Sequence, residues 1–191
     1  MTGGWSRVLW LHVWGTIMLV LASLPALAGT GDPAGVRSTS AAIREIVDDA
    51  AWESPTFRGL VRDIAASDGI VYIEEGVCHH SVHACLRLDV TPAAGYRILH
   101  ILVDLRGVLA HRSRLDLIAT LGHELCHASE VLGDRSLTTA SAIFLFYVHQ
   151  AATTHSTFET AGAVATGQKI RRELGHGVTF VWQQVALNMS W

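Results

Sequence analysis

The spacing of apolar and polar residues divides the chain into helical and extended segments. Between residues 40 and 65, apolar side chains recur at helical spacing in two runs, which predict two covering helices. A break between them is expected at Ser54-Pro55, because a residue that precedes proline disfavours helical geometry. From residue 69 the apolar residues form short β-branched runs or alternate, as is typical of strands. We expect a small antiparallel sheet of three strands, over residues 70–73, 85–90 and 96–105.

Helical spacing returns between residues 115 and 132, in the segment around which the chain is organised. The apolar residues on one side of this helix are Ile118, Leu121, Leu125, Ala128 and Leu132. His123 and His127 fall on the opposite side, where residues four apart share a face. We therefore expect a helix that buries its apolar stripe in the core, directs both histidines away from it, and ends at Gly133-Asp134.

Two more helices are predicted after this segment. Residues 138–150 are apolar on all sides, which indicates a buried helix. Residues 156–174 form a further helix, on which Glu159 shares a face with small residues. These small residues are Gly162, Ala163 and Thr166. Because small side chains allow close approach, we expect Glu159 to point at the helix packed against this face.

Together these elements predict one α+β domain over residues 39–175. A chain of 191 residues that is 50% hydrophobic can bury a real core. Residues 29–38, rich in turn-forming residues, are expected to be a flexible lead-in, and residues 176–191 form a tail to which no packing is assigned. The formal net charge is -3 and no basic run stands out, so nucleic-acid binding is not expected.

Residues 1–28 have the pattern of a signal peptide. Arg7 provides the positive start, the segment from Val8 to Leu24 is almost continuously apolar, and Ala26-Leu27-Ala28 resembles a cleavage site. Cleavage before Gly29 would release a periplasmic or secreted protein. The alternative is an uncleaved membrane anchor, since the apolar run is nearly long enough to span a bilayer. Membrane contact is expected only through this segment.

Export changes how the cysteines are interpreted. In an oxidising compartment, Cys78 and Cys85 are expected to form a disulfide that closes a loop. The alternative is a second metal site that combines these two cysteines with nearby histidines. Those histidines are His79, His80 and His83. Cys126 is left over and is interpreted as a small buried residue.

The segment from His123 to His127 reads His-Glu-Leu-Cys-His, which is the arrangement that a helix needs to bind zinc. Residues four apart are separated by roughly 6 Å along the helix axis, so His123 and His127 can aim imidazole nitrogens at one ion. Glu124 lies about 100° further round the helix. It is therefore predicted to stay off the metal and to act as general base toward a water molecule.

A catalytic zinc site has three protein ligands and an open position, so a third ligand must come from elsewhere in the chain. The candidates are Glu130, Cys126, His149, His155 and Glu159. Glu130 lies about 10 Å along the axis from His123, so a role in orienting a histidine is favoured. Glu159 is predicted as the third ligand, because a carboxylate on a separate helix completes the His2Glu set of hydrolytic zinc sites. His149 and His155 remain alternatives.

Residues 115–132 and 156–174 resemble a zincin metallopeptidase of the gluzincin type, in which His-Glu-x-x-His and a downstream glutamate bind zinc. The signal segment, residues 67–72, the run from His123 to Val131, and Phe158-Glu159-Thr160 also resemble a group of exported bacterial proteins of unassigned activity. The resemblance implies a zincin-like fold. Two patterns depart from known subclasses. Glu130 and Gly133 replace the glycine and third ligand of metzincins, and Ala163 replaces the aspartate of the common gluzincin motif.

The resulting hypothesis is an exported zinc metallopeptidase with a peptide or protein substrate. Zinc held by His123, His127 and Glu159 would activate a water molecule whose proton Glu124 accepts. The segment from Tyr96 to Asp104 is expected to bind substrate backbone by strand addition. Candidate oxyanion donors are Tyr147, His149 and His155. The alternatives are a non-hydrolytic exported metal-binding protein and an interaction module in which both histidines belong to the core.

Overall fold

The computed structural model describes residues 35–78, 83–105, 111–151 and 159–188, which all belong to one compact unit, Asp32–Trp191. The predicted signal peptide lies outside the described residues, as do His79, His80 and His155. Five helices and a sheet are present in the described part of the chain, which confirms the α+β class. No helix in this part combines the length and the apolar character that a membrane span requires.

The first two helices are separated where the sequence predicts. Helix α1 spans Ala41–Glu53 and α2 spans Pro55–Ala65. Ser54 has an extended backbone between them, and its hydroxyl accepts a hydrogen bond from the Phe57 N–H at 3.0 Å. Pro55 occupies the first helical position, where its missing N–H is not needed. Ser54 therefore caps α2 while the preceding helix stops.

The sheet has more strands than predicted, and it is mixed rather than antiparallel. Its strands are β1 (Gly35–Arg37), β2 (Gly69–Glu75), β3 (Ala84–Leu86), β4 (Thr91–Ala93) and β5 (Tyr96–Val103). The order is β1-β2-β5-β3, with β4 also paired to β5. Strand β2 runs parallel to both β1 and β5, whereas β3 and β4 run antiparallel to β5. The prediction of an antiparallel sheet is therefore wrong.

The parallel pairing of β2 with β5 is explained by the connection between these two strands. The stretch of residues 76–95 is long enough for the crossover that a parallel pair requires. This stretch also contributes β3 and β4, which pair with β5 on the side away from β2. Strand β5 is thus interior to the sheet, and the predicted addition of a substrate strand to it is wrong. The last strand in the sheet order is β3.

Two strands lie outside the predicted strands. Strand β1 falls in the expected flexible lead-in, and β4 falls between the second and third predicted strands. Each spans three residues, too few for an alternation to be recognised in the sequence. Ala94 and Gly95 join β4 to β5, and both have positive φ, the backbone that tight hairpin turns require. Strand β3 is correspondingly short and ends at Leu86, before the predicted boundary at Val90.

The three later helices are α3 (His111–Gly133), α4 (Ala140–Ala151) and α5 (Ala161–Asn188). Helix α3 ends at the predicted glycine but begins at His111, before the predicted start at residue 115. Helix α4 lies close to its predicted range, but the prediction of a buried helix is wrong, because Phe144, Leu145 and Val148 are exposed. Helix α5 begins later than the predicted start at residue 156 and continues past Gly175 into the predicted tail. A single glycine within a helix costs only about 1 kcal/mol relative to alanine, which is too little to end it.

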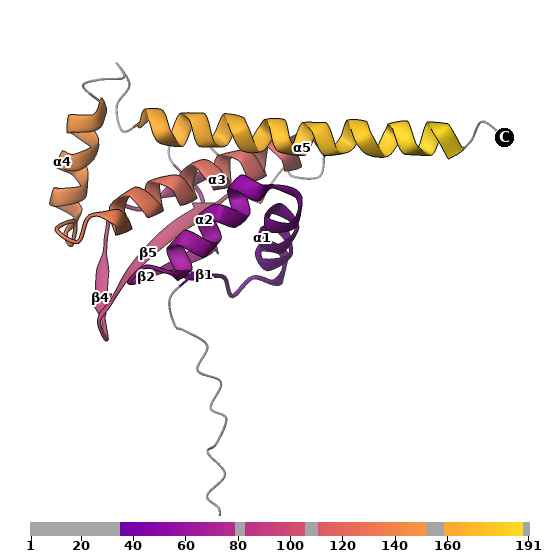
Figure 1. The fold of residues 1–191 in the computed structure, drawn as a ribbon. Helices are drawn as coiled ribbons and strands as arrows, with labels where there is room; N and C mark the ends of the chain where they lie inside the picture. Colours follow the sequence, from indigo (N-terminus) through magenta and orange to yellow (C-terminus); the bar gives the residue numbers. More distant parts are fainter. Residues whose placement is uncertain (1–34, 79–82, 106–110, 152–158, 189–191) are drawn as a thin grey trace, which may run out of the picture. The chain divides into compact units, whose positions relative to one another are not determined.

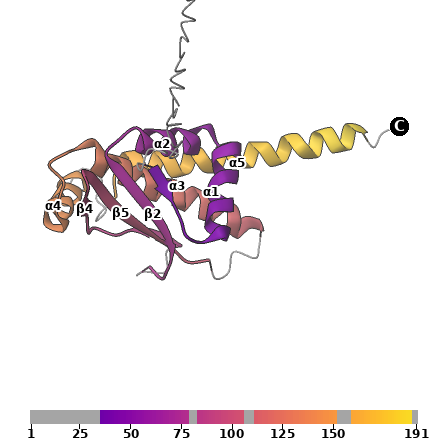
Figure 2. The same cartoon turned by 90° about the horizontal axis from the view of Figure 1, so that it is seen from below.

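The elements form layers, with α3 between the sheet and α5 (Figures 1 and 2). The predicted apolar stripe of α3 is buried, and it packs in one core with the inward-facing residues of β5. These inward-facing residues are Leu99, Ile101 and Val103. The opposite side of α3 is available to α5, which runs beside it in both views.

Close contact between α3 and α5 depends on glycine. A Cβ atom added at Gly122 would lie 2.2 Å from Cδ1 of Ile170, and one added at Gly167 would lie 3.2 Å from the carbonyl oxygen of Ala119. Such distances leave almost no room for a side chain at either position. The prediction of a small-faced helix is thus confirmed. The residues that let the helices touch are Gly122 and Gly167.

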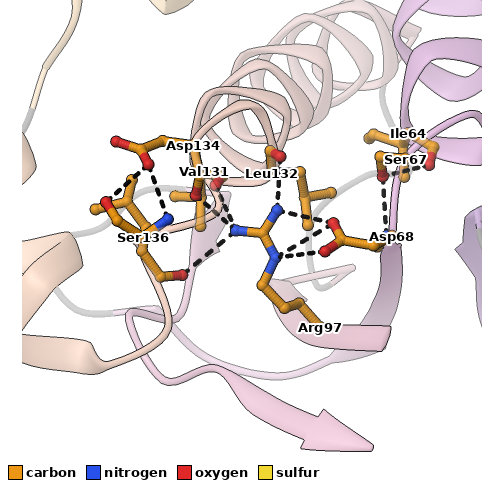
Figure 3. Close-up of polar contacts among 10 residues, drawn as sticks. Ile64, Ser67, Asp68, Arg97, Val131, Leu132, Asp134 and Ser136 are labelled. Atoms are coloured by element: carbon orange, nitrogen blue, oxygen red, sulfur yellow. Dashed lines mark hydrogen bonds and ion pairs between the residues drawn. The ribbon is translucent and has the colours of Figure 1, made fainter. Parts of the chain in front are cut away.

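Arg97 joins the sheet to the end of α3 (Figure 3). The side chain comes from β5, is only 5% exposed, and donates hydrogen bonds to backbone carbonyls at the helix end. The accepting residues are Val131 at 2.9 Å, Leu132 at 2.6 Å and Asp134 at 2.7 Å. Asp68 balances the charge with an ion pair of 2.8 Å. Arg97 thus satisfies carbonyl groups that a helix end leaves without intrahelical partners.

We predict that the Asp68–Arg97 pair stabilises the protein above about pH 4. The hydrogen bond from Arg97 lowers the pKa of Asp68, so this contribution is present above the unfolded-state pKa and is lost as pH falls through the folded-state pKa. Asp68→Asn should lower the free energy of unfolding by about 1–2 kcal/mol at pH 7. Urea unfolding of both proteins at pH 7 and pH 3 should show the difference shrinking at pH 3.

Asp89→Asn is the control for this experiment, because Asp89 forms an ion pair with Arg87 in which both side chains are 48% exposed. Exposed pairs contribute little, so no measurable loss is expected at either pH. An equal deficit of Asp68→Asn at both pH values would contradict the prediction.

We also predict that Gly122→Ala destabilises the protein, although alanine favours helix by about 1 kcal/mol over glycine. The new Cβ would overlap Cδ1 of the fully buried Ile170, and overpacking costs about 1–3 kcal/mol. Ile170→Val removes that Cδ1 atom, at an expected cost of about 0.5–1.5 kcal/mol by itself. In a double-mutant cycle, the double variant should be more stable than Gly122→Ala alone. Additive losses would contradict the proposed contact.

Candidate metal centre

Three of the predicted residues come together at the N-terminal end of α5. His123 and His127 lie one turn apart on α3, with their rings edge to face and their centroids 4.7 Å apart. The Nε2 atom of His123 lies 3.0 Å from Oε2 of Glu159. One ligand atom from each of these residues lies within 4.8 Å of the other two, so the group could hold a metal ion.

The start of α5 determines where Glu159 lies. The hydroxyl of Thr160 accepts a hydrogen bond from the Ala163 N–H at 3.0 Å, and its carbonyl accepts one from Val164. Thr160 is therefore the N-cap of the helix. Glu159 precedes the helix rather than sharing a face with its small residues, so the predicted location on the helix is wrong. Its carboxylate nevertheless reaches His123.

The contact between the helices brings this cap close to the histidines. A Cβ atom at Gly167 would lie 3.4 Å from Cβ of His123, so the backbone of α5 lies directly against the first histidine. Burial lowers the pKa of His123, and the neighbouring His127 lowers it further, against the opposing charge of Glu159. A neutral imidazole is the form that binds metal ions.

Glu124 contacts strand β3 through one of its carboxylate oxygens. Its Oε2 accepts a hydrogen bond from the Leu86 N–H at 2.8 Å. Burial raises the pKa of Glu124 to about 7, although the charge of His127 and the hydrogen bond from Leu86 favour the ionised form. A carboxyl group with this pKa can exchange a proton near neutral pH, as a general base must.

Glu130 contacts His127, which fits the predicted orienting role, and it does not belong to the group of three. Its Oε2 lies 3.0 Å from Nδ1 of His127, which is 5% exposed. The other carboxylate oxygen, Oε1, accepts a hydrogen bond from the Thr160 hydroxyl at 2.7 Å. A carboxylate that binds the outer nitrogen of a histidine is a common partner of metal-ligating imidazoles.

The remaining candidates are separate from this group where the structure describes them. Cys126 accepts a hydrogen bond from Thr166 at 3.5 Å, and burial raises its pKa, which keeps the thiol protonated. His149 is exposed on α4. The Tyr147 hydroxyl donates to the carbonyl of His127 at 3.1 Å. Because its proton is used there, Tyr147 does not fit the predicted role of oxyanion donor.

The predicted disulfide between Cys78 and Cys85 is present. It joins the chain just after β2 to the middle residue of β3. Both thiols are consumed by this bond, so the alternative of a second metal site with cysteine ligands is wrong. The disulfide also fastens the short strand that carries Leu86, the residue whose N–H contacts Glu124.

Two contributors to the site are absent from the sequence prediction. The Leu86 N–H is a backbone group, so the identity of the residue does not reveal its hydrogen bond to Glu124. Thr160 does give a signal, because threonine before a helical run is a preferred N-cap. With Thr160 as the N-cap, the helix starts at residue 161 and Glu159 lies just before it.

Comparison of the chain with models of known protein families, with curated proteins and with solved structures gave no match.

Proposed function

We propose that His123, His127 and Glu159 bind zinc, and that the protein is an exported, zincin-like metallopeptidase. The observation that carries the proposal is the cluster of three ligand atoms within 4.8 Å, with a fourth ionisable group, Glu124, on the same helix. Two imidazoles and one carboxylate are the ligands of hydrolytic zinc sites. The adjacent glutamate is the partner that such a site requires as base.

The size of the group suits zinc. Ligand atoms lie about 2.0–2.2 Å from zinc, so tetrahedral geometry separates them by about 3.4 Å from one another. His123 Nε2 and Glu159 Oε2 are 3.0 Å apart, and the whole set lies within 4.8 Å. Small side-chain rotations would therefore suffice. Two histidines and a carboxylate also suit non-haem iron, so metal analysis is part of the test.

Zinc, when bound, would polarise a substrate carbonyl and lower the pKa of a water molecule. The protein contributes an oriented base. The Leu86 N–H holds Oε2 of Glu124, which leaves Oε1 of that carboxylate to accept the proton of the attacking water. The same oxygen would then donate this proton to the amine that leaves the cleaved peptide bond.

A peptide substrate would meet β3 rather than β5. Strand β3 ends the sheet order, and the Leu86 N–H points away from β5 toward Glu124. An extended peptide can pair with such an edge through its backbone. Export to the periplasm or the exterior is supported by the N-terminal sequence and by the Cys78–Cys85 disulfide, which is typical of oxidising compartments.

We predict that Glu124→Gln abolishes hydrolysis and leaves zinc bound. The amide keeps the size of the side chain and still accepts a hydrogen bond, but it cannot take up a proton. Cleavage of a denatured protein or a peptide mixture should fall by at least about 100-fold, while the zinc content of purified residues 29–191 stays at the wild-type value. Unchanged cleavage with zinc present would rule out Glu124 as the base. A wild-type protein that binds zinc without cleaving peptides would favour the non-hydrolytic alternative.

We predict that Glu159→Ala weakens zinc binding by more than the roughly 10–100-fold typical of a residue that only supports a ligand. His149→Ala is the matched control, because His149 is exposed on α4 and outside the group. Zinc affinity is measured by competition with a chelator, and bound metals are identified by elemental analysis. His155→Ala is included because that residue was an alternative ligand. If His155→Ala releases zinc and Glu159→Ala does not, the assignment of the third ligand is wrong.

A further inference from the structure

A chain of hydrogen bonds links the two helices that supply the metal group. The Ala163 N–H donates to the hydroxyl oxygen of Thr160, and that hydroxyl donates to Oε1 of Glu130. Oε2 of Glu130 faces Nδ1 of His127 at 3.0 Å. We propose that Glu130 and Thr160 are positioning residues for the metal group, which hold His127 and Glu159 in register with each other. We call this chain the Glu130–Thr160 relay. The inference rests on the proposed metal site and is independent of hydrolysis.

The relay selects one tautomer of His127. A carboxylate only accepts hydrogen bonds, so the nitrogen that faces Glu130 must carry the proton. With the proton on Nδ1, the lone pair of His127 is on Nε2, the nitrogen left for a metal ion. The negative charge of Glu130 also strengthens the imidazole as a ligand.

The relay also determines the placement of Glu159. Thr160 follows Glu159 directly, and consecutive Cα atoms are about 3.8 Å apart. Anchoring the Thr160 side chain to α3 therefore fixes the backbone from which the Glu159 carboxylate extends. Glu130 thus orients His127 by contact with its ring, and it orients Glu159 through the neighbouring residue Thr160.

The residues of the relay are buried or partly buried. The side chains of His127 and Glu130 are 6% and 23% exposed, and Thr160 is 6% exposed. A Cβ atom at Gly162 would lie 3.1 Å from Oε1 of Glu130, so glycine leaves room for the carboxylate at the helix start. Partly buried hydrogen bonds of an ionised group hold a fixed geometry better than exposed ones.

Thr160 also caps α5. The experiment must therefore separate the effect of this cap on helix stability from the effect of Thr160 on the placement of the metal ligands. Glu130→Gln makes this separation, because it leaves the Thr160 cap on the Ala163 N–H in place. Ser54→Ala is the control for a general loss of stability, because the Ser54 hydroxyl caps α2 through the Phe57 N–H and donates to Glu173 on α5. A loss of stability alone would affect Thr160→Val and Ser54→Ala similarly, whereas a loss of positioning would also appear in Glu130→Gln and not in Ser54→Ala.

The test measures zinc affinity of residues 29–191 by chelator competition for Glu130→Gln, Thr160→Val, Thr160→Ser and Ser54→Ala. We expect Glu130→Gln and Thr160→Val to bind zinc about 10–100-fold more weakly. Thr160→Ser keeps the hydroxyl and should remain within about threefold of wild type, and Ser54→Ala should be unchanged on the same scale. Wild-type affinity in both Glu130→Gln and Thr160→Val would overturn the proposal, as would an equal loss in Ser54→Ala.

A second measurement needs no metal. Nitrogen chemical shifts of the His127 ring in the metal-free protein should show the proton on Nδ1, and Glu130→Gln should reduce the population of that tautomer. A ring protonated on Nε2 in the wild type would overturn the relay. If the relay variants weaken zinc binding as expected but the wild type cleaves no peptide, the positioning role is supported and the peptidase proposal is contradicted. A wild type that binds no zinc would overturn both proposals.

Discussion

The close contact of α3 with α5 is the constraint on which the candidate site depends. Gly122 and Gly167 remove the side chains that would hold the two helices apart. Without that contact, the carboxylate before α5 would not reach the first histidine of α3, and the hydroxyl of Thr160 would not reach Glu130. A packing requirement between two helices thus decides whether residues distant in sequence form one group.

Helix α3 uses three of its sides for different purposes. Its apolar stripe is buried against β5, its histidine side meets the start of α5, and Glu124 is directed to the edge of the sheet at β3. Arg97 fastens its last turn to β5. A helix held on several sides keeps its side chains in fixed directions, as a preorganised site requires.

Local chemistry in the sequence was sufficient to predict several features. The break at Ser54-Pro55, the orientation of α3 and the disulfide all follow from neighbouring residues and their spacing. The sheet was predicted wrongly because the direction of strand pairing depends on how the chain returns after β2. The sequence predicts Glu159 as a ligand because a carboxylate on a separate helix completes a His2Glu set, and it places Glu159 on the face of that helix. Glu159 lies instead before the helix, where the Thr160 cap and the helix contact bring it to His123.

The location of Gly122 has a consequence for recognising the same arrangement in other sequences. The residue that permits the helix contact is the covalent neighbour of the first histidine, and Glu130 follows the second at a fixed interval. Glu159, Thr160, Gly162 and Gly167 are likewise close together on the second segment. The two segments can be written as G-H-E-x-x-H-x-x-E and E-T-x-G-x-x-x-x-G. This paired signature includes the packing and the orienting carboxylate, so it is more selective than the five-residue motif alone.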